Sequence, residues 1–291
     1  MMSSEDYKSY YEKKNYQETE IKMERIIHDE NLLRQHNIHN IYDAYLSDVD
    51  KKEGFLMKNE AGFDILNTFS NEELEPIVKL ITEKGSISQL LTRSEEYKTY
   101  YPDHQKYVNV IKDELSLMGG NSVVNFFRRR GVSYREMVMD VCDQLDARYN
   151  KKFSTEHIEH RLLEKIIEDA WKKMSQEERT EVLQKIGNPE KGSSSMTNST
   201  LISLFRAGGV ASYRISLMIA NSLCQSISGR GLALARNATL IGLPMLIGPL
   251  GFVISAIRVA GPAYRVTVPA VTYIAALRNA HHLTEWDGPS L

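Results

Sequence analysis

Residues 237–257, NATLIGLPMLIGPLGFVISAI, form the most apolar part of this 291-residue chain and contain no charged side chain. As one helix they would span roughly 31 Å, about the hydrocarbon thickness of a bilayer. Their mean hydropathy is about +2 on a common scale, in the range typical of membrane insertion. The Leu243-Pro244 and Gly248-Pro249 pairs disfavour a single straight helix. We therefore expect an apolar helical hairpin whose two short helices meet near residues 247–251.

An apolar hairpin of this kind has to be covered, and the sequence leaves open what covers it. The alternatives are burial under the chain's own helices or a second subunit, reversible or re-entrant membrane insertion, and a stable transmembrane span. Arginines flank both ends, so neither orientation across a membrane is preferred. The predicted membrane or partner contacts are Leu240, Ile241, Leu243, Leu246, Ile247, Leu250, Phe252, Val253, Ile254 and Ile257. The candidate contacts to an anion or a lipid head group are Arg230, Arg236, Arg258 and Arg265.

The region around this segment differs in charge from the rest of the chain. Residues 192–291 contain seven arginines, two acidic residues and no lysine, which gives a net charge of +5 against −7 for residues 1–191. Arginine keeps its charge when it is partly desolvated, and its planar head is weakly hydrated. The arginine-only composition therefore favours apolar or anionic surroundings for these side chains.

Short helices with clear start signals are expected over residues 63–188. Residues 70–73 and 175–178 match the capping-box pattern of Ser followed three residues later by Glu. The strongest helix begins at Ser154 or Thr155, and its apolar stripe consists of Ile158, Leu162, Leu163, Ile166, Ile167, Ala170 and Trp171. Residues 200–230 predict a helix, or a pair of helices, that is broken or closely packed at Gly208-Gly209. A last helix is expected from about Pro269 to His281.

These signals predict an all-α fold, in which a multi-helix domain of short helices precedes a Gly/Pro-rich apolar helical hairpin unit. Residues 1–60 would be a charged, Tyr-rich amphipathic helical extension, and residues 63–190 an acidic all-α domain. The small polar residues 191–199 read as a linker. Residues 200–291 would then be an Arg-only, glycine-rich hydrophobic helical unit.

Three short motifs suggest chemistry, but a structural role explains each of them better. The FFRRR run at residues 126–130 places three arginines at a helix C-terminus, where they complement the helix dipole. The EHIEH run at residues 156–160 has no second cluster that would complete a metal site, so we read it as a solvated helix face. A phosphate-binding loop requires a strand before it and a Lys-Ser/Thr pair after it, and the SGRG run at residues 228–231 has neither. We expect no catalytic residue, metal site or cofactor.

Four segments together resemble a known family. They are NTFSNEELEPIVKLIT (67–82), ELSLMGGNSVVNFFRRRGVSYREMVMDVCDQL (114–145), AWKKMSQEERTEVLQ (170–184) and PAYRVTVPAVTYIAALR (262–278). In order and spacing they resemble the YaaW-like family of uncharacterised bacterial proteins, over about residues 63–280. The central part of that family is grouped with ubiquinol–cytochrome c chaperone-like domains. The resemblance implies a helical protein with no assigned enzymatic activity.

The sequence thus predicts a non-enzymatic, membrane-associated interaction or assembly factor that presents a hydrophobic hairpin. A membrane-perforating effector and a soluble homo-oligomeric scaffold are the alternatives. A protein partner or self-association is expected, with membrane lipid as a further candidate, and neither nucleic acid nor a small-molecule substrate. Cys142 and Cys224 match no metal or redox spacing, and the N-terminus lacks a secretory signal. These features favour the cytoplasm, with a peripheral position at the inner face of the membrane as an extension.

Overall fold

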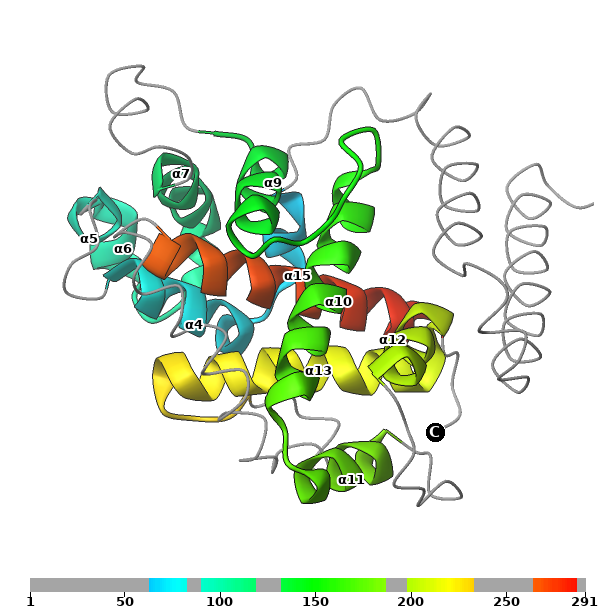
Figure 1. The fold of residues 1–291 in the computed structure, drawn as a ribbon. Helices are drawn as coiled ribbons and strands as arrows, with labels where there is room; N and C mark the ends of the chain where they lie inside the picture. The colour runs from blue at the N-terminus through cyan, green and yellow to red at the C-terminus, as the bar shows by residue number, and fades with distance from the viewer. Residues whose placement is uncertain (1–62, 83–89, 119–131, 187–197, 233–263, 287–291) are drawn as a thin grey trace, which may run out of the picture.

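The computed structural model describes residues 63–82, 90–118, 132–186, 198–232 and 264–286, and the all-α prediction is confirmed (Figure 1). The described elements are η1 (Asp64–Thr68), α4 (Asn71–Thr82), α5 (Leu90–Arg93), α6 (Glu95–Tyr100), η2 (His104–Tyr107), α7 (Val108–Met118), α9 (Tyr134–Gln144), α10 (Thr155–Lys173), α11 (Gln176–Lys185), α12 (Asn198–Ala207), α13 (Gly209–Ser228) and α15 (Tyr264–Trp286).

Side-chain caps fix where several of these helices begin, as the sequence predicts. At α4, the Ser70 backbone N–H donates to a Glu73 carboxylate oxygen at 2.8 Å, and the Glu73 N–H donates to Ser70 Oγ at 3.3 Å. The same reciprocal pair opens α11, between Ser175 and Glu178. Ser154 caps α10 by accepting from the N–H of His157. Each cap satisfies backbone donors that the first turn of a helix leaves without an intrahelical acceptor.

The centre of the molecule is a pair of long helices, α13 and α15, that lie side by side in opposite directions (Figure 1). The Asn279 amide near the end of α15 donates to Ser212 and Ser216 near the start of α13. Tyr273, earlier on α15, lies close enough to Cys224, later on α13, for the two groups to interact electrostatically. This pairing places the end of α13 and the beginning of α15 at the same end of the molecule.

Helix α10 crosses this central pair and contacts α9, α12 and α15 (Figure 1). Its predicted apolar stripe is confirmed, because all seven stripe residues are buried. The core continues across the predicted 191–199 linker, since one cluster of buried residues joins α4, α7, α9 and α10 with α12, α13 and α15. The domain division at that linker stays a prediction, and residues 1–60 lie outside the described part of the chain.

The last helix begins earlier than the sequence suggests. The predicted start at about Pro269 is wrong: α15 begins at Tyr264 and Pro269 lies inside it. Pro269 and the β-branched residues before it have low helix propensity, which favours a start after them. Val266 and Val268 are instead buried against the core, and their burial outweighs the intrinsic preference. The break at Gly208-Gly209 is confirmed, because α12 ends at Ala207 and α13 begins at Gly209.

Candidate functional site

The predicted contact residues fall into two groups. The ten apolar residues from Leu240 to Ile257, together with Arg236 and Arg258, lie outside the described residues, and so does the FFRRR run. Arg230 and Arg265 are described, and both are exposed. Arg230 follows the end of α13 and Arg265 lies in the first turn of α15, so the antiparallel pairing brings both to one end of the central pair. This end also carries the two points, Leu232 and Tyr264, between which the apolar segment is connected.

The SGRG run lies at the end of α13. This position agrees with the interpretation of the run as a structural feature and not as a phosphate-binding loop. Gly229 adopts the left-handed conformation, with φ of 71°, that closes α13, and its N–H donates to the carbonyl of Gln225 at 2.9 Å. Ser228 Oγ donates to the Cys224 carbonyl at 2.7 Å. The ammonium group of Lys79 lies 3.5 Å from the Ser228 carbonyl oxygen. Carbonyl groups converge here, which suits a cation and disfavours a phosphate.

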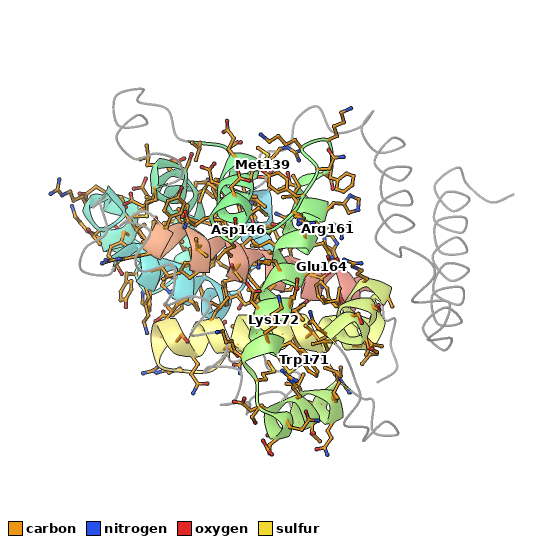
Figure 2. All side chains as sticks on the ribbon, viewed as in Figure 1. Met139, Asp146, Arg161, Glu164, Trp171 and Lys172 are labelled. Carbon is orange, nitrogen blue, oxygen red and sulfur yellow. The ribbon has the colours of Figure 1, made fainter. Side chains whose placement is uncertain are left out.

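A first buried ionic cluster joins α10 to α12. The carboxylate of Glu164 accepts two hydrogen bonds from the Arg206 guanidinium, at 2.8 and 2.7 Å, and a third from Arg161 at 3.0 Å. The three side chains are 5–8 % exposed. Burial alone would raise the pKa of Glu164, but the two arginines outweigh it and hold the pKa below its usual value. Figure 2 shows Arg161 and Glu164 along the middle of α10.

A second buried ionic cluster joins α10 to α9 and α15. The Tyr134 hydroxyl on α9 donates to Glu159 on α10, and Arg278 Nε of α15 lies 2.9 Å from the other Glu159 oxygen. The Arg278 guanidinium also lies over the Tyr134 ring, at 5.6 Å from its centroid. Burial and the negative charge of Glu159 raise the pKa of Tyr134 well above its usual value, so the phenol stays protonated. Glu159 therefore connects three helices.

Between the two ionic clusters, His160 connects α10 to the central pair. Its Nε2 lies 3.0 Å from Asn279 Oδ1, and Asn279 in turn donates to Ser216 at 2.7 Å and Ser212 at 3.1 Å. Burial lowers the pKa of His160 below its usual value. The prediction of a solvated face for residues 156–160 is wrong, because Glu159 is buried and His160 is half-buried. The reason is that α15 and α12 cover this side of α10.

These polar groups position helices; they do not converge on an open cleft. A small apolar pocket, with a cavity volume of about 30 Å³, lies between α10, α11, α12 and α13, and its lining consists of Ile167, Ala170, Met174, Val182, Leu201, Ile215, Met218 and Ile219. Burial raises the pKa of the Cys142 thiol to about 12, so it carries no thiolate at neutral pH. Over the described ranges, no three His, Cys, Asp or Glu side chains gather as metal ligands do. Within the same ranges, no helix has the length and apolar character that crossing a bilayer requires.

Sequence reasoning missed both ionic clusters, although it contained one relevant signal. The arginine-only composition of residues 192–291 predicts anionic or apolar surroundings, and Arg206 and Arg278 do lie against buried carboxylates. What the sequence could not supply is the pairing, because Arg206 lies 42 residues from Glu164 along the chain. Only the crossing of α10 over α12 and α15 brings these charges together.

Comparisons with known proteins find relatives along most of the chain. A UPF0174 protein of Helicobacter pylori strain J99 is 40% identical over 211 residues, which cover 70% of this chain and 83% of that protein. A second, of strain 26695, is 39% identical over 199 residues and 95% of its own length. The UPF0174 protein YaaW of Escherichia coli K12 is 32% identical over 238 residues, which cover 78% of this chain and 97% of that protein. No family model and no solved structure matches.

Proposed function

The chain belongs to the UPF0174 family, as the YaaW-like resemblance predicts, and on that premise we propose that it is a non-enzymatic, membrane-associated interaction or assembly factor. In this proposal the packed helices are a base, and the uncharged residues 237–257 are the part that meets lipid or an apolar partner. The chaperone-like character implied by the family resemblance belongs to the same proposal: the apolar hairpin would cover an apolar surface of a client during its assembly.

One observation carries this proposal. The antiparallel pairing of α13 and α15 holds both connection points of the apolar segment at one end of a well-packed core. The end of α13 is capped there, and exposed arginines, Arg230 and Arg265, accompany the two connection points. An apolar segment held at both ends on a stable base, with cations beside it, is suited to contact with an anionic bilayer.

Vesicle flotation of the full chain tests the proposal. The comparison variant replaces residues 237–257 by a Gly/Ser linker of equal length, and circular dichroism with thermal unfolding confirms that its helical base still folds. We expect the full chain to float with vesicles that contain anionic lipid and the linker variant to stay in the dense fraction. If the folded full chain is absent from the floating fraction at every lipid composition tested, membrane association is refuted.

Two further measurements separate the alternatives. Release of a dye trapped in the same vesicles would identify a membrane-perforating effector, whereas passive association leaves the dye inside. Size-exclusion chromatography with light scattering identifies a soluble homo-oligomeric scaffold if it gives one defined oligomer whose mass and elution are indifferent to lipid.

A further inference from the structure

A group of aromatic side chains lies near the end of the molecule where the apolar segment is connected. Tyr100 and Tyr101, at the end of α6, are 46 % and 54 % exposed. The ring centroid of Tyr101 lies 5.2 Å from that of Tyr97 and 5.9 Å from that of His104. We call Tyr97, Tyr100, Tyr101, His104 and Tyr107 the aromatic shelf.

The buried members of the aromatic shelf hold its exposed members in place. Tyr107 is buried, and its ring contacts both Tyr97 at 5.5 Å and His104 at 5.6 Å, edge to face. His104 is buried as well, and its Nε2 lies 2.9 Å from Glu75 on α4. The exposed ring of Tyr101 therefore rests on an ordered layer of rings, and it loses little rotamer entropy when it is covered.

Helix α4 connects the aromatic shelf to the end of α13. Glu75, which holds His104, forms an ion pair with Lys79 one turn later at 3.2 Å. The Lys79 ammonium reaches the Ser228 carbonyl, two residues before exposed Arg230. Figure 1 shows α5 and α6 on the same side of the molecule as the end of α13 and the beginning of α15. The exposed tyrosines and the two exposed arginines thus border the same end.

The charges at this end favour an anionic surface over a neutral one. Two acidic side chains near the shelf are paired with lysines, since Lys98 lies 2.8 Å from Glu95 and Lys79 lies 3.2 Å from Glu75. Arg230 and Arg265 add positive charge beside the connection points. Tyrosine rings with a wet hydroxyl and an apolar body, next to cations, are the side chains that membrane–water interfaces select.

We propose that the aromatic shelf, together with Arg230 and Arg265, is a docking face for an anionic lipid bilayer. This inference rests on the proposed membrane association and adds its orientation: the α6 end of the molecule faces the head groups. The opposite end, where Val210 lies in the first turn of α13, faces away from the bilayer. Tyr100 and Tyr101 enter the head-group region beside the connection points of the apolar segment, while the arginines contact lipid phosphates.

The test uses the full chain with vesicles of phosphatidylcholine alone or with added phosphatidylglycerol. Arg230→Gln should weaken partitioning onto the anionic vesicles about fivefold, the effect of one cation near such a surface. The double change Tyr100→Ser with Tyr101→Ser should weaken it about fivefold or more, through lost apolar contact. Two matched controls, Arg148→Gln in the loop between α9 and α10 and Val210→Ser at the far end of α13, should bind as the unchanged chain does.

A depth measurement checks the orientation directly and does not depend on those affinities. An environment-sensitive fluorophore is attached to Tyr100→Cys or to Val210→Cys, because the native Cys142 and Cys224 are buried. Vesicle binding should shift the emission of the label at position 100 to the blue and leave the label at position 210 unchanged.

The outcomes separate this inference from the proposed function. If the unchanged chain binds no vesicle, membrane association itself fails, and the docking face fails with it. If the chain binds but the arginine and tyrosine variants bind equally well, or the label at position 210 shifts instead, the docking face is overturned and membrane association stands.

Discussion

Glu164 is the residue on which the packing of α10 against α12 most depends. It neutralises two buried arginines at once, and its removal leaves both Arg161 and Arg206 buried without that partner. Breaking a buried ion pair from one side is strongly destabilising, because the remaining charge keeps its desolvation cost. The cluster of Glu164, Arg161 and Arg206 is therefore expected to contribute far more to stability than any exposed ion pair on the same helix.

We predict that Glu164→Gln lowers the free energy of unfolding by about 3 to 5 kcal/mol, measured by denaturant titration. Glu168→Gln is the matched control, since Glu168 lies one turn further along α10, is only partly buried, and pairs with the exposed Lys172 at 2.7 Å. Its loss should cost no more than about 0.5 kcal/mol. Equal effects of the two changes would show that the buried cluster has no special weight.

His160 predicts a pH dependence of stability. Burial lowers its pKa in the folded protein, so the unfolded chain binds the proton more readily. Its contribution to stability is therefore complete above the unfolded pKa of about 6.5 and is lost as the pH falls through the lower folded pKa. The slope from one such group is at most about 1.4 kcal/mol per pH unit.

The measurement compares the unchanged chain with His160→Gln, by denaturant unfolding at several pH values between about 5 and 8. The unchanged chain should lose stability towards acid more steeply than the variant, because glutamine has no proton to gain. Parallel pH profiles for the two proteins would show that the pH dependence does not originate at His160.

At the scale of elements, two glycines set the ends of α13 by different conformations. Gly208 has φ of 78° and ψ of −150°, a region that only glycine adopts readily, whereas Gly229 has φ of 71° and ψ of 4°, close to the left-handed helical region. A Cβ at Gly229 would meet no heavy atom within 4 Å, so only backbone strain opposes a side chain there.

Substitution at these glycines should therefore follow two patterns. Gly229→Ala should cost about 1 kcal/mol, and Gly229→Asn less, because asparagine tolerates the left-handed conformation. At Gly208, both alanine and asparagine should cost about 1 to 3 kcal/mol. Thermal unfolding of the four variants measures this. Rescue by asparagine at position 208 would contradict the assigned backbone geometry.

The elements also differ in whether the sequence alone could predict them. The serine caps are local and could be read directly, because cap and acceptor lie three residues apart. The apolar stripe of α10 could be read for the same reason. The start of α15 could not, because the burial that overrides Pro269 comes from distant helices. The ionic clusters were equally out of reach, since Arg278 and Glu159 are far apart in sequence.

At the scale of the whole molecule, the core is shared between the two parts that the charge pattern separates. The buried residues Val268, Val271, Tyr273 and Ile274 of α15 belong to the same cluster as those of α4, α9 and α10. We predict that residues 63–190 produced alone do not fold cooperatively, because their apolar faces lose α13 and α15. Circular dichroism during heating measures this, with the full chain as control. A sharp transition in the fragment would support an independent domain.

The shared end of α13 and α15 has a mechanical consequence. Any pull on the intervening stretch, from lipid or from a client, would reach both helices in one direction and leave their mutual register unchanged. The load would instead act as shear against α4 and α10. On α10, Glu159 forms an ion pair with Arg278, and His160 contacts Asn279. Single-molecule pulling on both helices from that end should therefore meet higher rupture forces than pulling that peels the two helices away from each other.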